Sequence, residues 1–205
     1  MIYEPGQVRN LFPHINFQPS HFILAGPANG NEGQIFHEVY PSVPIIGLEP
    51  HQGGFQYQVQ EQFPGMLLPM AIGQAVEMSG MRLSVIGQGK LVDMPGSAYL
   101  VPVVTLEWLN CYFGPFQDAI LWMDIEGSEM PALVGGRDLL QGGSIRLMNI
   151  EIIETAELGM EAELNRFKDY LDPLGFEVVK EWNCEFLSPK KDRYRRDVIF
   201  RRKQT

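Results

Sequence analysis

The chain has 205 residues, a net charge of −9 at pH 7 and an apolar content of 45%. This length suits one α/β domain with a sizeable core and is short for two ordinary domains joined by a linker. No run of the sequence approaches the ~18 consecutive apolar residues that a membrane-spanning helix needs. We therefore expect a single domain over residues 1–205 that does not enter a membrane.

The cysteines and the first residues bear on location. Cys111 and Cys184 lie far apart, and the sequence has no CxxC pair or clustered histidines. This disfavours a zinc site or a disulfide framework and fits a reducing compartment. Residues 1–5 lack the basic-then-apolar pattern of a secretory signal. The expected location is the cytoplasm.

The charge is unevenly distributed along the chain. Residues 190–205 hold eight basic and two acidic side chains, a net charge of +6, which leaves −15 for residues 1–189. A basic tail could contact phosphate groups, but the acidic body would repel nucleic acid. We favour the interpretation that these basic side chains flank an edge strand and discourage edge-to-edge pairing. No nucleic-acid partner is expected.

Apolar runs alternate with helical patterns from residue 21 onward, which is typical of a parallel sheet covered by helices. The pattern predicts five strands of a main sheet, at residues 21–25, 43–48, 66–72, 119–123 and 144–153. It also predicts a terminal pair of strands, at residues 176–182 and 197–200.

Helices are expected between these strands. The first has Ile35, Phe36 and Val39 directed inward, and a later one begins after Thr105 as its N-cap and continues through residue 109. The other predicted helices cover residues 53–62, the apolar pattern of residues 130–139, and residues 160–171.

Two segments lie outside this alternation. Residues 73–99 are rich in glycine and serine, and residues 81–86 alternate with a period of two, which predicts a hairpin-like β insertion. Residues 1–20 form a short N-terminal extension that would leave a pocket partly uncovered. We therefore consider a homodimer in which a second subunit completes the pocket.

The most informative motif follows the strand predicted at residues 119–123. The chain there continues as Asp124-Ile125-Glu126-Gly127 and passes at once into a helical pattern. In an α/β sheet, ligands bind at the carboxyl ends of the parallel strands, where loops lead into helices. Two carboxylates at this point indicate a functional site.

A glycine-rich loop follows the first predicted strand. Its glycines are Gly26, Gly30 and Gly33, so the spacing is neither G-x-G-x-x-G nor a P-loop. Glycines here allow positive φ and let backbone N–H groups approach a ligand closely. The loop by itself fits a cofactor site or an ordinary strand-to-helix turn equally well.

Glu49 favours the cofactor site. It ends the second predicted strand, 23 residues after Gly26. In nucleotide-binding βαβ units, an acid about 20 residues after the glycine loop binds the ribose hydroxyls. The competing interpretation is a solvated acid before the turn at Pro50.

These motifs together resemble the FkbM-type family of S-adenosylmethionine-dependent methyltransferases, and the resemblance runs from about residue 21 to the end. Its most specific part is D-I-E-G-S-E at residues 124–129, which matches the family pattern D-x-E-G-x-E after a strand. The segments G-L-E-P at residues 47–50 and V-P-V-V-T-L-E at residues 101–107 are also similar.

The resemblance implies a Rossmann-like class I methyltransferase fold, an α/β fold with a seven-stranded, mostly parallel sheet, an antiparallel last strand and helices on both faces. It implies S-adenosylmethionine as cofactor and methyl transfer to a hydroxyl oxygen of a sugar or secondary-metabolite-type small molecule. Glu49 would bind the ribose and Asp124 would stand beside the methyl group, with Asp124 and Glu126 as the candidate catalytic residues. The expected cofactor-binding residues are Gly26, Ala28, Asn29, Gly30, Glu32, Gly33, Glu49, Pro50, Met70, Ala71 and Asp124.

Two positions depart from the family pattern, a milder one at Glu107, where aspartate is usual, and a more important one in the first loop. The first loop usually begins with an acid two residues before its first glycine, and this acid helps to anchor the amino group of the cofactor. Here the corresponding residue is Leu24 or Ala25, depending on the alignment. Asn29 or Glu32 could take the place of the missing acid.

Methyl transfer is an in-line displacement, so the protein mainly aligns the reactants and excludes water. An alcohol acceptor must also lose a proton, which Asp124 could take. Asp124 and Glu126 could instead share a divalent cation, and Glu151 could converge with them in space. We expect no metal.

Two alternatives to a methyltransferase remain. Because Leu24 or Ala25 replaces the acid, the chain could be a catalytically silent methyltransferase-like module that binds a partner or a nucleoside. A nicotinamide-dependent oxidoreductase is a third hypothesis, although the glycine spacing differs from the dinucleotide fingerprint and the acidic turn has no role in it.

Overall fold

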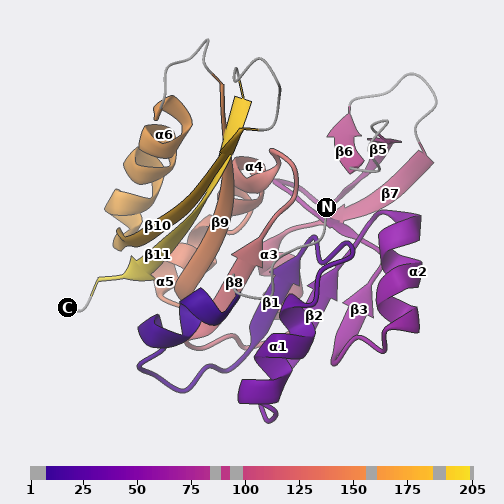
Figure 1. Cartoon of the computed structure of the whole chain (residues 1–205), viewed down its shortest axis with the longest axis horizontal. Coiled ribbons are helices and arrows are strands. Elements are labelled where there is room, and N and C mark those ends of the chain that lie inside the picture. The colour runs from indigo at the N-terminus through magenta and orange to yellow at the C-terminus, as the bar shows by residue number, and fades with distance from the viewer. Residues whose placement is uncertain (1–7, 84–88, 93–98, 156–160, 187–192, 204–205) are drawn as a thin grey trace.

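The structure is a computed structural model, and it describes residues 8–83, 89–92, 99–155, 161–186 and 193–203 (Figure 1). Its main element is a seven-stranded sheet with the order β10-β11-β9-β8-β1-β2-β3. The strands are β1 (Phe22–Ala25), β2 (Ile45–Leu48), β3 (Met66–Leu68), β8 (Ala119–Met123), β9 (Ile145–Thr155), β10 (Phe176–Phe186) and β11 (Arg193–Arg202). β11 runs antiparallel to both of its neighbours and the other pairs are parallel. The predicted seven-stranded, mostly parallel α/β sheet is confirmed.

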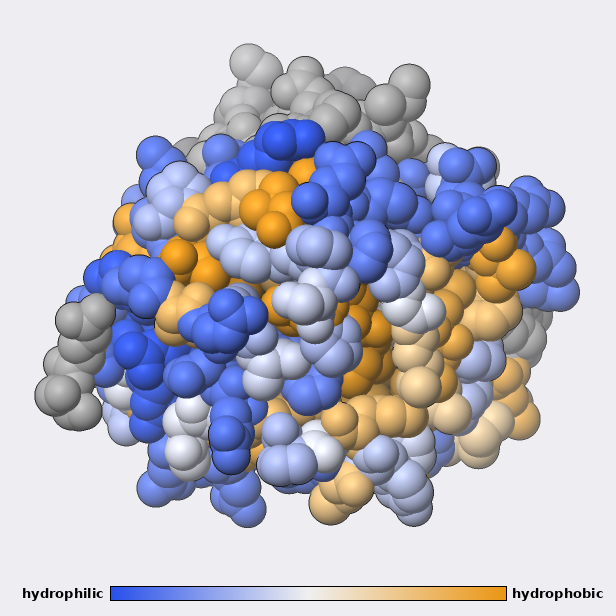
Figure 2. All heavy atoms as spheres, turned by 90° about the horizontal axis from the view of Figure 1, so that it is seen from below, coloured by the Kyte–Doolittle hydropathy of each residue, from blue (hydrophilic) through white to orange (hydrophobic). Residues whose placement is uncertain are grey.

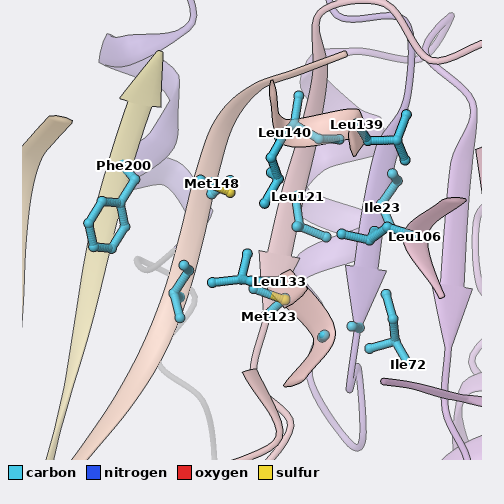
Figure 3. Packing of buried hydrophobic residues seen from close by; sticks show 14 of the residues in the cluster. Ile23, Ile72, Leu106, Leu121, Met123, Leu133, Leu139, Leu140, Met148 and Phe200 are labelled. Atoms are coloured by element: carbon cyan, nitrogen blue, oxygen red, sulfur yellow. The ribbon is translucent and has the colours of Figure 1, made fainter. Parts of the chain in front are cut away.

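Helices cover both faces of this sheet. On one face lie η1 (Val8–His14) and α1 (Glu32–Val39), whose Leu11 and Phe36 are buried with Trp122 of β8. On the other face lie α3 (Leu106–Phe113), α4 (Glu129–Val134), α5 (Arg137–Gly142) and α6 (Ala162–Leu171). Figure 3 shows this second core, in which Leu106, Leu133 and Leu140 pack against Ile23, Leu121 and Met148 of the strands. α2 (Gln52–Gln60) lies beside β3 at the end of the sheet (Figure 1).

The predicted strand at residues 66–72 is wrong in one respect, because the chain divides it between two sheets. β3 belongs to the main sheet, whereas β4 (Ala71–Ile72) pairs with β7 (Tyr99–Val104) in a second sheet. The break falls at Pro69, which has no backbone N–H to donate to a ladder. The chain therefore leaves the main sheet at the carboxyl end of β3.

The second sheet has four strands in the order β4-β7-β5-β6. Its β5 (Glu77–Leu83) and β6 (Gly89–Val92) pair antiparallel within the segment where the sequence predicts a β insertion. Residues 84–88 and 93–98 of that segment lie outside the described residues. Figure 1 shows this sheet above α2, on the side toward which the parallel strands of the main sheet point.

The interpretation of the basic tail as an edge strand is wrong. β11 lies between β10 and β9, so β10 is the edge strand at this end of the sheet. Arg195 and Arg196 are buried and make ion pairs with Glu151 and Glu181, at 3.1 and 3.3 Å. Apolar alternation at residues 197–200 predicts a strand, but it does not say which strands lie on either side. These two arginines thus pair with carboxylates of the neighbouring strands, one buried (Glu151) and one exposed (Glu181).

The inward position predicted for Val39 is also wrong, since 44% of this residue is exposed. Ile35 and Phe36 are buried as predicted. α1 ends at Val39, and the following residue, Tyr40, stacks on Phe36 with a ring separation of 5.0 Å. Tyr40, and not Val39, therefore continues the apolar face of Ile35 and Phe36.

The helical pattern of residues 130–139 is divided between α4 and α5, and the other predicted elements are present with shifted ends. Thr105 caps α3 by accepting a hydrogen bond from Trp108 N at 3.0 Å, but the helix continues beyond residue 109 to Phe113. β10 and β11 are longer than the predicted segments because they pair with each other beyond the core.

The parallel strands of the main sheet end at the side shown uppermost in Figure 1. Figure 2 shows the opposite end from below, where hydrophobic residues form a broken band among hydrophilic ones. Within the described residues, no helix combines the length and apolar character required to span a membrane.

Candidate active site

Three predicted site residues lie at the carboxyl ends of adjacent parallel strands. Gly26 follows β1, Glu49 follows β2 and Asp124 follows β8, and β1 pairs with both β2 and β8. Backbone hydrogen bonds extend this pairing past the strands: Gly26 N donates to Leu48 O at 2.9 Å, and Asp124 N donates to Ala25 O at 3.1 Å. The glycine loop, Glu49 and the acidic turn therefore share one edge of the sheet.

Gly26 is required by this geometry for two reasons. Its φ is +81°, a left-handed conformation that side chains disfavour. A Cβ atom at this position would also lie 2.0 Å from the carbonyl oxygen of Asp124. Glycine lets the loop after β1 pass directly against the end of β8.

Glu49 is buried, with 3% of the residue exposed, so the interpretation as a solvated acid is wrong. Its Oε2 accepts a hydrogen bond from Ala28 N and its Oε1 accepts one from His51 N, both at 2.8 Å. Burial raises the pKa of Glu49, and these two N–H donors oppose the rise. The carboxylate thereby connects the glycine loop to the start of α2.

Gln58 of α2 holds the glycine loop from the other side. Its Nε2 donates to the carbonyl oxygens of Pro27, Ala28 and Gly30 at 3.2, 3.1 and 2.8 Å. The side chain is fully buried. Three loop carbonyls thus converge on one amide group, which fixes the loop against the neighbouring βα unit.

Glu32, the first residue of α1, is buried although it is charged, with 5% of the residue exposed. Its carboxylate fills the space beside Gly30, where a Cβ atom would lie 2.0 Å from Oε2. Burial raises the pKa of Glu32 to about 7, and its own backbone N–H partly opposes the rise. Glu32 is the only acid of the loop from residue 26 to residue 33.

The other predicted cofactor residues lie around this loop. Asn29 is exposed at its tip, and Gly33 faces the ring of Phe63, whose Cε2 lies 3.0 Å from a Cβ built on Gly33. Gly33 therefore serves helix packing. Pro50 and Met70 are half-buried and Ala71 is buried; they lie near the ends of β2 and β3, where Glu49 N donates to Leu68 O at 3.0 Å.

The acidic turn after β8 is shaped by Glu129, a buried residue at the start of α4. One of its oxygens, Oε1, accepts hydrogen bonds from Ile125 N at 2.9 Å and from Gly127 N at 3.2 Å. Glu126 and Gly127 both have positive φ, at 58° and 96°. The extended conformation of the strand thus ends at Glu126. Glu129 accepts hydrogen bonds from the N–H groups of the turn that have no strand partner. Burial raises the pKa of Glu129 to about 7.

Asp124 and Glu126 meet a third carboxylate, that of Glu151 on β9. One oxygen from each of the three lies within 4.8 Å of the others. Burial raises the pKa of Asp124 well above its ordinary range, and Glu151, which also shares a hydrogen bond with it, raises it further. Asp124 therefore holds its proton to a higher pH than an exposed aspartate.

Asp197 extends this group from β11, where it pairs with Glu151 in the strand register. Burial, followed by the charge of Glu151, raises its pKa to about 7. Asn149 Nδ2 donates to Asp197 Oδ1 at 3.5 Å, and Arg195 binds Glu151. The region is thus acidic and only partly neutralised by the chain.

A divalent cation could bind Asp124, Glu126 and Glu151, because oxygen-rich clusters of this size suit Mg²⁺ or Ca²⁺. The convergence of Glu151, which the sequence left open, is confirmed. The ion pair of Glu151 with Arg195 already supplies one positive charge to the group. A proton shared between Asp124 and Glu151 is the other way to relieve the repulsion.

Three residues of the site were missed by the sequence analysis. Glu129 is the last acid of D-x-E-G-x-E, so the motif carried a signal for it without indicating its role. Asp197 stands in an apolar strand, where an acid is unusual. Nothing in the sequence pattern distinguishes Gln58 from the other glutamines of α2.

Solved structures of methyltransferases share this fold at low sequence identity. Magnesium protoporphyrin IX methyltransferase from Synechocystis, solved with bound S-adenosylmethionine, aligns with a TM-score of 0.52 and 11% identity over 96% of this chain and 76% of that one. A Streptococcus pneumoniae protein described as a tRNA (m1A22) methyltransferase, solved with S-adenosylmethionine, aligns with a TM-score of 0.51 and 12% identity over 100% of this chain and 75% of that one.

A transferase from Pyrococcus horikoshii aligns with a TM-score of 0.51 and 10% identity over 100% of this chain and 66% of that one. Identities this low indicate a shared fold and nothing further about substrates. No curated protein matches the sequence significantly.

The sequence itself matches the methyltransferase FkbM domain over residues 29–178, which is well over half of the chain. The matched range includes Glu49, the acidic turn at residues 124–129 and Glu151. The chain therefore belongs to the FkbM methyltransferase domain family.

Proposed function

We propose that this protein is an S-adenosylmethionine-dependent methyltransferase that methylates a hydroxyl oxygen of a small molecule of the sugar or secondary-metabolite type. The observation that carries the proposal is the position of Asp124. It lies at the same sheet edge as the glycine loop and Glu49, beside Glu126 and Glu151. Family membership and the class I methyltransferase fold support the cofactor.

The residues at this edge fit a cofactor that carries two positive charges, a sulfonium and an ammonium. The acidic group around Asp124 suits the sulfonium by charge. The loop from Gly26 to Gly33 would hold the amino-acid part, and Pro50, Met70 and Ala71 would border the adenine. Asn29 at the loop tip and Ala28 would line the same site.

Glu49 would bind the ribose hydroxyls. Each of its oxygens accepts one backbone N–H and keeps a further lone pair for a hydroxyl donor. Because only 3% of the residue is exposed, a ribose reaches it only if neighbouring residues shift. We propose that Ala28 N–H moves from Glu49 to the ligand when the cofactor binds.

The bound cofactor supplies an electrophilic methyl group, and the chain must orient an acceptor oxygen toward it and remove its proton. Asp124 in its ionised form would accept that proton, and because burial and Glu151 raise its pKa it is a stronger base than an exposed aspartate. Glu126 would orient the acceptor hydroxyl, and Glu129 keeps both groups in place by holding the turn.

The charge of the chain supports a small hydroxylated acceptor. A neutral amine acceptor can lose its proton after transfer without a base, whereas an alcohol needs one at the site. An RNA acceptor would meet the acidic body of the protein, where its phosphates are repelled. A homodimer that covers the pocket remains a prediction.

A catalytically silent binding module is the second candidate, and one observation favours it. Leu24 and Ala25 at the end of β1 are buried apolar residues of the two cores, so neither offers an acid to the cofactor. An oxidoreductase has no comparable support, because hydride transfer gives no role to the cluster of Asp124, Glu126 and Glu151.

Turnover separates the first two candidates. Purified protein is incubated with S-adenosylmethionine and a panel of sugars and hydroxylated small molecules, with amine analogues of the same compounds, and the release of S-adenosylhomocysteine is measured. Methylation of a hydroxyl compound that is lost in Asp124→Asn supports the proposal. Cofactor binding without turnover on any hydroxyl compound favours the silent module, and preferential turnover of the amines contradicts O-methylation.

A further inference from the structure

Glu32 differs from other buried acids because, among the described residues, its carboxylate accepts no hydrogen bond from another residue, whereas Glu49 and Glu129 each accept two from backbone N–H groups. Among the described residues it makes no ion pair, and its own backbone N–H is the one hydrogen-bond donor that acts on its pKa. The buried Glu151, by contrast, is paired with Arg195 at 3.1 Å. A buried carboxylate without a partner is costly and is retained where it serves a ligand.

The surroundings of Glu32 indicate what kind of ligand it suits. Its charge contributes to the raised pKa of Asp197, so the two carboxylates lie close enough to repel each other. The acid of the glycine loop and the acidic group of Asp124, Glu151 and Asp197 therefore act on each other electrostatically. A positively charged ligand group bound near both would relieve this repulsion.

Gly30 and Glu32 are matched in shape. The three atoms nearest to a Cβ built on Gly30 all belong to the Glu32 carboxyl group, at 2.0, 2.7 and 2.8 Å. Glycine at residue 30 is thus what allows the carboxylate to lie in the loop. Gln58 fixes the same glycine through its carbonyl oxygen, at 2.8 Å.

We propose that Glu32 binds the α-ammonium group in the amino-acid part of the cofactor and supplies the acid that β1 lacks. This inference rests on the proposed function, since it assigns a residue within that site. The ammonium would replace the proton that burial otherwise retains on the carboxylate. The interaction is a charge-assisted hydrogen bond, which is about twice as strong as a neutral one.

The test compares two ligands that differ in one group. S-adenosylhomocysteine and the same thioether without its α-amino group are titrated calorimetrically into wild-type protein, Glu32→Gln and Gly30→Ala. Glu32→Gln keeps the shape of the side chain and removes its charge. Gly30→Ala displaces the carboxylate, and the backbone of Gly30 has no positive φ that would oppose alanine. The matched control is Glu38→Gln, an exposed acid on the same helix.

Both variants should weaken binding of S-adenosylhomocysteine about 10- to 100-fold, which is the range expected for the loss of a hydrogen bond to a charged group. Binding of the amino-free ligand should change less than about 3-fold, and Glu38→Gln should bind both ligands like the wild type.

Three other results have distinct meanings. Equal weakening of both ligands would show that Glu32 only shapes the loop, which overturns the inference. Unchanged affinity in Glu32→Gln would overturn it as well, while leaving the proposed function in place. If the wild-type protein binds neither S-adenosylhomocysteine nor S-adenosylmethionine, the proposed function itself fails.

Discussion

Gln58 holds Gly30 through a hydrogen bond of 2.8 Å from its Nε2 to the glycine carbonyl oxygen. The same amide also contacts the carbonyls of Pro27 and Ala28. The loop after β1 is therefore positioned by a side chain of α2. Glu49, which lies between β2 and α2, also accepts a hydrogen bond from Ala28 N in this loop. The cofactor loop and the ribose-binding acid are parts of one hydrogen-bonded assembly.

Gln58→Leu should therefore damage both stability and ligand binding. The substitution keeps approximate volume but removes the amide donor of three loop carbonyls. Pro27 O still accepts from Gly30 N, whereas the buried Gly30 O loses its bond from Gln58, and an unsatisfied buried group costs about 1–3 kcal/mol. We expect a Tm lower by several degrees and weaker binding of S-adenosylhomocysteine, measured by thermal denaturation and calorimetry. Gln56→Leu, an exposed position on α2, is the control. Wild-type affinity in Gln58→Leu would contradict the positioning role.

Asp124→Asn should separate catalysis from binding. The amide cannot accept the acceptor proton, so kcat should fall at least about 100-fold, within the range of general-base contributions. Binding of S-adenosylmethionine should weaken more than binding of S-adenosylhomocysteine, because only the former carries the sulfonium charge. The measurement is turnover on a hydroxyl compound that the wild-type protein methylates. Asp138→Asn, at an exposed position, is the control. Retained turnover in Asp124→Asn would exclude it as the base.

The sheet was predictable because its signal is local. Buried parallel strands appear as short apolar runs. The acidic turn at residues 124–129 is recognisable because its charged residues directly follow such a run. The division of residues 66–72 between two sheets was not predictable, because it depends on the partner strand β7. The interior position of β11 was not predictable for the same reason, because strand order depends on the whole sheet. Glu32 and Gln58 became visible only with burial and partners known.

The buried carboxyls predict an unusual pH dependence of stability. Burial raises the pKa values of Glu32, Glu129 and Asp197 to about 7 from ordinary values of 4.5, 4.5 and 3.8. The folded protein thus binds these protons more tightly than the unfolded chain. Their contribution to stability is fully present below the ordinary values and is lost as pH rises through 7.

Between pH 5.5 and 8, Tm should accordingly fall by about 4 °C or more. Glu32→Gln should have a flatter profile and a higher Tm than the wild type at pH 8, because it removes a buried charge. Calorimetric scans of the ligand-free protein measure both effects. A Tm that rises over this range would show that these carboxyls are paired in solution.

Removal of divalent cations tests the cluster of Asp124, Glu126 and Glu151. Because a shared proton and Arg195 can relieve its repulsion, we expect protein treated exhaustively with EDTA to retain S-adenosylhomocysteine binding and methyl transfer. The readouts are calorimetric affinity and turnover before and after treatment. Loss of turnover that Mg²⁺ restores would instead assign these three carboxylates to a metal ion.

The most direct test of the account is the titration of S-adenosylmethionine and S-adenosylhomocysteine into the wild-type protein by isothermal calorimetry. The account predicts saturable binding of both ligands with one site per chain, and loss of most of that affinity in Glu49→Gln, which removes the charge from the ribose-binding acid. If neither ligand binds at millimolar concentration to folded protein, the assignment of a methyltransferase site to this sheet edge is contradicted.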